Sequence, residues 1–271
     1  MLSWKRVCLF ACACILGVSF AVHMRAGEPQ RAGDKTRLLL GSVPDEAWLS
    51  QYVGNRISGK VLRGLVAGDQ VVVLYQEEKA GGAVRLSVIE RETELRIWEY
   101  AHGDAVTSGL SPGPLLAACR LSHNGTWDIL LCVTLEEGKT NYGEKWSRHL
   151  YVFPGGKAIG SLDIPLSAMD VNFHRNEEPW PGLSSDSDPS QPALERDACV
   201  IVKPAAGLLI LVSTETRLRS ERDEQEPRPG PVSIQVWRWD RTHVEKREGS
   251  VAELTGLLLG GYGGDVGLVL K

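Results

Sequence analysis

The sequence predicts a mainly β protein built from antiparallel four-stranded meanders. Three observations lead to this prediction. Apolar, β-branched runs of strand length recur along the chain. Glycines separate neighbouring runs as they do in hairpin turns, at Gly68, Gly125 and Gly207. The same order of strand, glycine turn, apolar strand, loop, aromatic strand and polar strand occurs three times, which is typical of repeat architectures.

Residues 1–23 have the pattern of an export signal. Lys5 and Arg6 precede an uncharged apolar run over residues 7–22, with small residues near its end. The run is shorter than the ~20 residues of a typical membrane-spanning helix. We therefore expect export to the periplasm or the extracellular space, with a membrane anchor at residues 7–22 as the alternative. Residues 24–35 are polar and predict a linker.

One short helix is expected before the first meander. Residues 44–55 place apolar side chains at helical spacing. Asp45 can cap its first turn, and Gly54 can end it.

Residues 36–271 form the predicted mainly β domain. Its repeat-like units are expected at about 60–103, 113–165 and 197–249. The polar stretches between and within the later units are rich in Pro, Ser and charge, so they predict surface loops. Each unit carries an aromatic residue at a similar distance from its turn glycine: Trp98, Phe153 and Trp237.

This strand order resembles the blades of secreted bacterial β-propellers of the integrin-like, FG-GAP type, over about residues 60–248. The resemblance rests on the strand order and on the aromatic strand of each unit, and it implies a propeller-like arrangement. Repeats of that type typically carry an Asp- and Gly-rich calcium loop. This sequence contains no such run, so calcium binding is not implied. The alternative is a β-sandwich, because four-stranded units cannot bury both faces alone.

The cysteines outside the export signal are Cys119, Cys132 and Cys199. An odd number leaves at least one thiol unpaired within the chain. A turn centred between Gly125 and Thr126 would place Cys119 opposite Cys132, where a disulfide could form in an oxidising compartment. The alternative is that all three are small buried side chains within strands.

No catalytic or metal-binding motif is complete. The stretch 109–113 matches GxSxG, but Pro112 follows the serine and has no N–H for an oxyanion hole. The six histidines form no HxH or HExxH pair, and no CxxC occurs. The net charge of −4 gives no electrostatic reason to expect a nucleic acid. We therefore expect no catalytic residue, no metal and no cofactor.

Two groups of residues are candidates for ligand binding. Trp237 and Trp239 share one face of a predicted strand, where they form either a platform for a sugar or peptide, or part of the core. Asp170, His174 and Glu177 lie in an acidic stretch that could bind a ligand or serve acid–base chemistry. The alternative for that stretch is a solvated loop.

These observations favour a non-catalytic exported binding or structural module of the cell envelope, which recognises a protein or a glycan through loops. The alternative is a secreted hydrolase that uses carboxylates of the region 163–197. That alternative requires four side chains to converge in one pocket: Asp163, Asp170, His174 and Glu177. No nucleic-acid partner is expected, and membrane attachment would occur only through residues 7–22.

Overall fold

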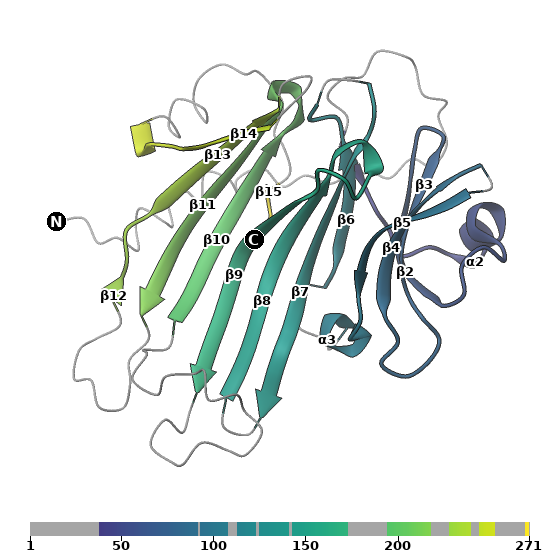
Figure 1. The fold of residues 1–271 in the computed structure, drawn as a ribbon, viewed down its shortest axis with the longest axis horizontal. Coiled ribbons are helices and arrows are strands. Elements are labelled where there is room, and N and C mark those ends of the chain that lie inside the picture. The colour runs from purple at the N-terminus through teal and green to yellow at the C-terminus, as the bar shows by residue number, and fades with distance from the viewer. Residues whose placement is uncertain are drawn as a thin grey trace. The chain divides into compact units, whose positions relative to one another are not determined.

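The computed structural model describes residues 38–91, 93–107, 113–122, 125–140, 143–172, 194–217, 228–239, 244–252 and 269–270. Their strands form a small sheet and a large sheet, in both of which all neighbours are antiparallel (Figure 1). The small sheet has the order β2-β3-β4-β5. The large sheet has the order β1-β6-β7-β8-β9-β10-β11-β13-β14, with β12 paired to β11 and β15 paired to β10. The expectation of a mainly β fold with antiparallel four-stranded meanders is confirmed.

The small sheet contains β2 (Lys60–Ala67), β3 (Gln70–Gln76), β4 (Val84–Glu90) and β5 (Thr93–Tyr100). The large sheet contains β1 (Leu39–Leu40), β6 (Leu115–Cys119), β7 (Asp128–Thr140), β8 (Gly143–Phe153), β9 (Leu162–Asn172), β10 (Leu194–Lys203), β11 (Leu208–Arg217), β12 (Arg228–Pro229), β13 (Ser233–Trp239), β14 (Val244–Glu248) and β15 (Val269–Leu270). The helices are α2 (Glu46–Trp48), which continues as η1 (Leu49–Val53), and α3 (Gly103–Thr107), with single turns η2 (Pro154–Gly156) and η3 (Pro204–Ala206).

The large sheet joins two meanders. Strands β6 to β9 form one, and β10, β11, β13 and β14 form the other. They meet where Ala168–Asp170 of β9 pair with Leu194–Arg196 of β10. This pairing gives both strand edges hydrogen-bond partners, so the described strands form two sheets and not a closed ring of separate blades. The sandwich alternative fits this arrangement.

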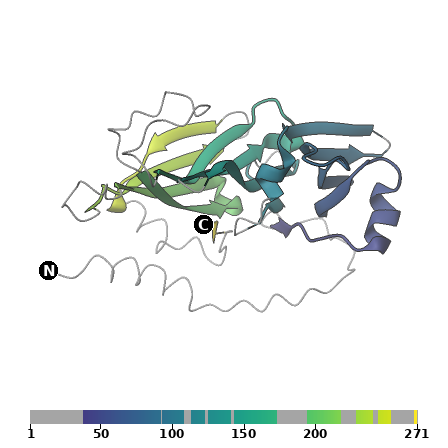
Figure 2. The same ribbon diagram turned by 90° about the horizontal axis from the view of Figure 1, so that it is seen from below.

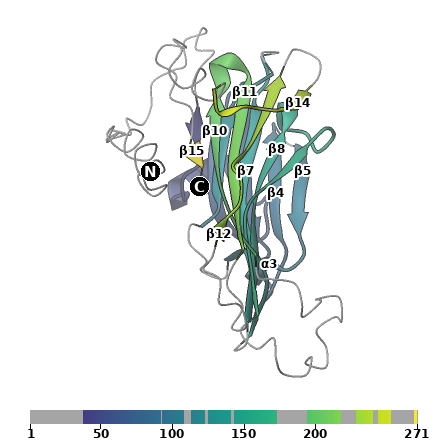
Figure 3. The same ribbon diagram turned by 90° about the vertical axis from the view of Figure 1, so that its left-hand side faces the viewer.

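Strand β7 is buried on both faces. Ile129, Leu131 and Val133 pack in one core cluster with residues of the small sheet. Leu130 and Cys132, on the opposite face of β7, belong to a second cluster that extends across the large sheet to β13. This explains why residues 129–133 of β7 are continuously apolar instead of alternating. Figure 3 shows β4 and β5 of the small sheet running alongside β7 and β8.

The expected helix forms over α2 and η1 and covers the outer face of the small sheet. The Asp45 carboxylate accepts a hydrogen bond from the Trp48 N–H at 2.7 Å, and Gly54 ends the helix with a φ of 52°. Trp48 and Tyr52 pack against Val73 and other apolar residues of β3 and β4. The purple helical segment lies beside the blue strands in Figure 2.

In the described part of the chain, Cys119, Cys132 and Cys199 form no disulfide. Cys119 pairs in register with Asp128, whereas Cys132 pairs with Leu115, so the two sulfur-bearing residues do not face each other. The turn is centred earlier than the disulfide would require, because Asp128 accepts hydrogen bonds from the N–H groups of the residues before the turn, Leu121 and Ser122. Burial raises the pKa of both Cys119 and Cys132.

The expected export signal at 1–23 and the linker at 24–35 lie outside the described residues. The described residues all belong to the unit formed by residues 35–271. Within that described part of the chain, no helix is both long enough and apolar enough to cross a membrane.

Candidate binding site

The two tryptophans expected as a platform are core residues. Trp237 and Trp239 are only 6% and 4% exposed, and both pack in the cluster that crosses the large sheet. The Lys246 ammonium group lies 5.3 Å from the centroid of the Trp237 ring, on a strand neighbour. Arg238, between them, is exposed on the other face of β13. The tryptophans are therefore buried too deeply to form a binding platform, which corrects their expected role as ligand-binding residues.

The acidic candidates are only partly placed by the structure. Asp170 lies in β9, where its backbone pairs with Lys145 of β8 and Leu194 of β10. His174 and Glu177 lie outside the described residues. Asp163 is described, and its carboxylate contacts a residue that the sequence did not single out, His149.

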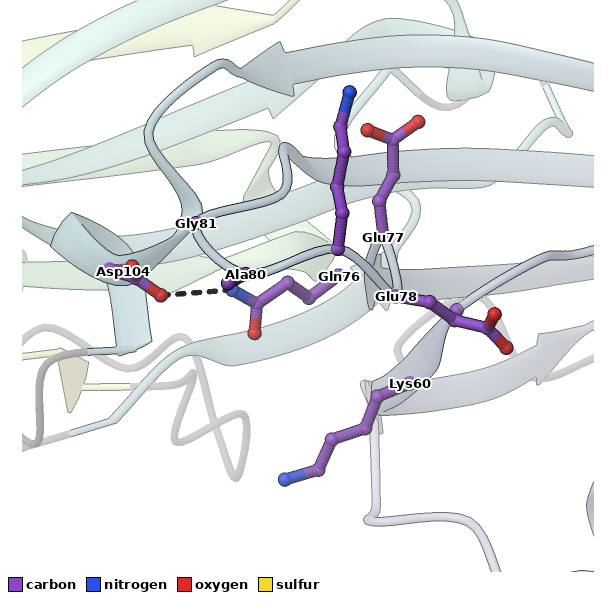
Figure 4. Close-up of a pocket in the computed structure, with 9 residues that line it drawn as sticks. Lys60, Gln76, Glu77, Glu78, Ala80, Gly81 and Asp104 are labelled. Carbon is purple, nitrogen blue, oxygen red and sulfur yellow. Dashed lines mark hydrogen bonds between the residues drawn. The ribbon is translucent and has the colours of Figure 1, made fainter.

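One open pocket of about 490 Å³ lies at an end of the small sheet (Figure 4). Its side chains diverge: Lys60 points away from Glu77 and Glu78, and Asp104 is occupied by a hydrogen bond from Gln76. Glu77 is already ion-paired with Arg85. Because these groups do not converge on a common point, the pocket lacks the arrangement of polar groups that fixes a ligand. The lining residues are Gly59, Lys60, Gln76, Glu77, Glu78, Lys79, Ala80, Gly81 and Asp104.

A second surface brings together rings from both sheets. We call Trp98, Tyr100, His149 and Tyr151 the aromatic patch. Trp98 and Tyr100 lie on β5, with ring centroids 6.3 Å apart and planes 11° apart. His149 and Tyr151 lie on β8, with centroids 5.7 Å apart and planes 12° apart. The Trp98 and Tyr151 rings join the two pairs at 5.5 Å. All four residues are partly exposed, and Trp98, Tyr100 and Tyr151 also pack against the core cluster that β7 shares with the small sheet.

Polar groups border the aromatic patch on β8 and β9. We call Ser147, His149 and Asp163 the polar triplet. His149 Nδ1 lies 2.7 Å from Asp163 Oδ1, and His149 Nε2 lies 3.1 Å from Ser147 Oγ. An ionised carboxylate can only accept, so Nδ1–H donates to Asp163. In the neutral imidazole Nε2 then accepts, and the Ser147 hydroxyl donates to it.

Strand geometry explains why these residues meet. Ser147, His149 and Tyr151 alternate along β8, so they project from the same face of the sheet. Asp163 of β9 is directly opposite Tyr151. It is therefore the diagonal neighbour of His149, which pairs with Pro165. The register shifts between Ser147 and His149, and such bulges redirect side chains.

The Tyr151 hydroxyl titrates unusually late. Burial raises its pKa to about 12, and the nearby Asp163 carboxylate acts in the same direction, whereas the hydrogen bond with Trp98 acts in the opposite direction. Tyr151 is therefore a neutral phenol at physiological pH. Its hydroxyl supplies a hydrogen-bond donor beside the Asp163 carboxylate.

The sequence contains part of the signal for this site. Ser147, His149 and Tyr151 recur at every second position of a predicted strand, and so do Trp98 and Tyr100. Neither the pairing of Asp163 with β8 nor the approach of β5 to β8 follows from that spacing. Both depend on strand register and on how the sheets pack.

Among the described residues, no group of three or more His, Cys, Asp or Glu side chains is arranged to hold a metal ion. Comparison with known proteins gives no match to a family model, a curated protein or a solved structure. The chemistry of the aromatic patch and the polar triplet therefore provides the basis for a function.

Proposed function

We propose that this protein is an exported binding module of the cell envelope that recognises a glycan through the aromatic patch. The observation that carries the proposal is the set of four partly exposed rings from β5 and β8, bordered by the Asp163 carboxylate. Export is supported by the basic start and apolar run of residues 1–23.

A saccharide suits the patch because it has two kinds of surface. The C–H face of a pyranose ring is apolar and can pack on Trp98 or Tyr100, as other apolar groups pack on aromatic faces. Its hydroxyl groups both donate and accept hydrogen bonds. The Asp163 carboxylate is 52% exposed and can accept them.

The site lies on strand faces and not on loops, which refines the mode of recognition expected from the sequence. Rings held by strands lose little conformational freedom when a ligand binds, because neighbouring residues already fix them. Trp98 packs against the buried core cluster that includes Leu86 and Phe153. A rigid surface of this kind favours a ligand that is itself stiff, such as an oligosaccharide.

Affinity electrophoresis tests the proposal. The full chain is run in native gels cast with laminarin, xylan or dextran, and in a gel without polysaccharide. We expect retardation in at least one polysaccharide gel. The substitution Trp98→Ala should weaken this binding about thirtyfold, which corresponds to the loss of about 2 kcal/mol typical of an aromatic anchor.

Trp146→Ala is the matched control. Trp146 lies on β8 and is partly exposed, but it alternates with Ser147 and so projects from the opposite face of the strand. This variant should bind as the wild type does. Equal mobility of the wild type and Trp98→Ala in every gel would rule out glycan recognition by the patch.

A further inference from the structure

We propose that the polar triplet hydrolyses carboxylic esters, with Ser147 as the nucleophile, His149 as the general base and Asp163 as the group that orients the histidine. The inference rests on the proposed function in one respect: the substrate class is an ester carried by a saccharide that binds the aromatic patch. The catalytic claim itself depends only on the geometry of the three side chains.

The hydrogen bonds run in the order that nucleophilic catalysis needs. Ser147 Oγ is 3.1 Å from His149 Nε2, within reach for proton transfer. His149 Nδ1 is 2.7 Å from Asp163 Oδ1, which holds the imidazole in the tautomer that leaves Nε2 free to accept the serine proton. The three side chains thus supply a nucleophile, a base and a hydrogen bond that orients the base.

The neighbouring rings hold His149 in place. Tyr151 stacks on the imidazole with planes 12° apart, so the ring cannot rotate freely. Tyr151 also lies directly opposite Asp163 in the strand register. The His149 side chain is 20% exposed, which is enough for a substrate carbonyl to approach while the ring stays packed. Tyr151 is thus a positioning residue for both His149 and Asp163.

The reaction balances with water as the only co-reactant. The Ser147 oxygen forms a bond to the carbonyl carbon while its proton moves to His149 Nε2, and the carbonyl electron pair moves to oxygen. The tetrahedral species then collapses: the bond to the alcohol oxygen breaks, and that oxygen takes the proton from His149. Water attacks the acyl-serine in the same manner. The acid is released, and Ser147 regains its proton.

The exposure of the site sets the expected rate and the type of substrate. Asp163 is 52% exposed, so water screens its charge and weakens its effect on His149. We therefore expect slow turnover. The open surface can accept an ester on a long chain, which an enclosed cavity would exclude.

Labelling of the wild-type chain provides a first test that requires no variant to fold. The full chain is treated with a fluorophosphonate, which reacts with activated serine hydroxyls, and the modified residue is located by peptide mass spectrometry. We expect one adduct, on Ser147, that is absent when the chain is denatured before treatment. Absence of an adduct on Ser147 in the folded chain would overturn the proposal.

Hydrolysis of p-nitrophenyl acetate provides the second test. Ser147→Ala and His149→Asn should each reduce kcat/KM by about 100-fold, and Asp163→Asn by about tenfold. The controls are Ser161→Ala, an exposed serine near Asp163, and His102→Asn, an exposed histidine that reports background imidazole catalysis. Both controls should keep the wild-type rate. Equal rates for wild type, Ser147→Ala and His149→Asn would contradict the inference.

The two proposals fail separately. Ser147→Ala should still bind polysaccharide in the native gel, because it lacks only a hydroxyl at the border of the patch. Retained glycan binding without ester turnover by the wild type would remove the catalytic inference and leave the proposed function intact. Ester turnover without glycan binding would support the catalytic claim. It would also contradict the proposal that a saccharide carries the ester.

Discussion

At the residue scale, the carboxylate of Asp128 connects two turns of the large sheet. Asp128 is fully buried, and its carboxylate accepts hydrogen bonds from the N–H groups of Leu121, Ser122 and Gly155 at 2.7, 3.0 and 2.8 Å. The first two donors precede β7 and the third follows β8. One carboxylate therefore accepts hydrogen bonds from backbone N–H groups of two separate turns.

Asp128→Ala should destabilise the protein by about 3 kcal/mol, because several buried N–H groups lose their acceptor and cannot reach water. Urea unfolding followed by tryptophan fluorescence measures this change. Asp69→Ala is the control, since Asp69 is exposed in the turn before β3, and it should shift the free energy of unfolding by less than about 0.5 kcal/mol. Similar effects of the two substitutions would contradict the assigned role of Asp128.

The raised pKa of Tyr151 predicts that the stability of the fold depends on pH. Its folded pKa of about 12 lies above the ordinary value of 10.0, mainly because the side chain is buried. Between these values the unfolded chain loses the proton that the folded chain keeps. The contribution of Tyr151 to stability is therefore fully present below pH 10 and is lost as the pH rises toward 12.

Ultraviolet absorbance of the phenolate tests this prediction. The chain has six tyrosines, and Tyr151→Phe should remove a phenol that titrates near pH 12. The difference between the wild type and Tyr151→Phe should appear near pH 12 and not near pH 10. A wild-type titration that coincides with that of Tyr151→Phe above pH 11 would show that Tyr151 is not shifted.

At the element scale, the helix formed by α2 and η1 depends on a glycine in the strand beneath it. A Cβ placed on Gly64 of β2 would lie 2.5 Å from the Trp48 ring. The bare backbone at this position lets the indole pack directly on the sheet. The same glycine pairs through its backbone with Ser42, which lies before the helix.

Gly64→Ala should therefore cost about 1–3 kcal/mol through overpacking against Trp48. Thermal unfolding gives the stability, and the cost should largely disappear when the same substitution is made in a Trp48→Ala background. Gly113→Ala is the matched control, because a Cβ there meets no atom within 4 Å. An equal cost of Gly64→Ala in both backgrounds would mean that the strain lies in β2 itself.

At the scale of the whole molecule, β7 is enclosed at both edges and, over residues 129–133, on both faces. It pairs with β6 and β8, and its two faces belong to two different core clusters. By contrast, β5 and β14 have one neighbour each among the described strands, and β14 is largely exposed. The two sheets therefore share a core cluster that neither sheet could bury alone.

Hydrogen exchange measures this difference. We expect the amides of residues 129–133 to exchange most slowly and those of β14 to exchange fastest. Within the small sheet, β3 should exchange more slowly than β5, which provides an internal control for strand position. Equally fast exchange of the β7 and β14 amides would contradict a core that the two sheets share.

Local pattern was enough to predict much of this fold. The turn glycines and the apolar runs beside them predicted the meanders, and Asp45 with Gly54 predicted the helix. Joining of the second and third meanders through β9 and β10 was not predictable, because it depends on long-range pairing of two strand edges. A disulfide between Cys119 and Cys132 required the turn before β7 to be centred between Gly125 and Thr126. The hydrogen bonds to the Asp128 carboxylate place that centre earlier, and they depend on the folded structure.

The candidate site was less predictable than the fold. Trp237 and Trp239 were visible as a pair, but only packing shows that they face the core. The spacing of Ser147, His149 and Tyr151 shows that they share a face. Their connection to Asp163 requires the register between β8 and β9, and their connection to Trp98 requires the contact between two sheets.

The charged character of β14 has a consequence for association between copies of this protein. This strand ends the large sheet, and Glu245, Lys246, Arg247 and Glu248 are all exposed along it. An incoming strand from another copy would have to place its own residues against both signs of charge. Such an edge discourages fibre growth, so many copies can fold side by side without pairing through this strand.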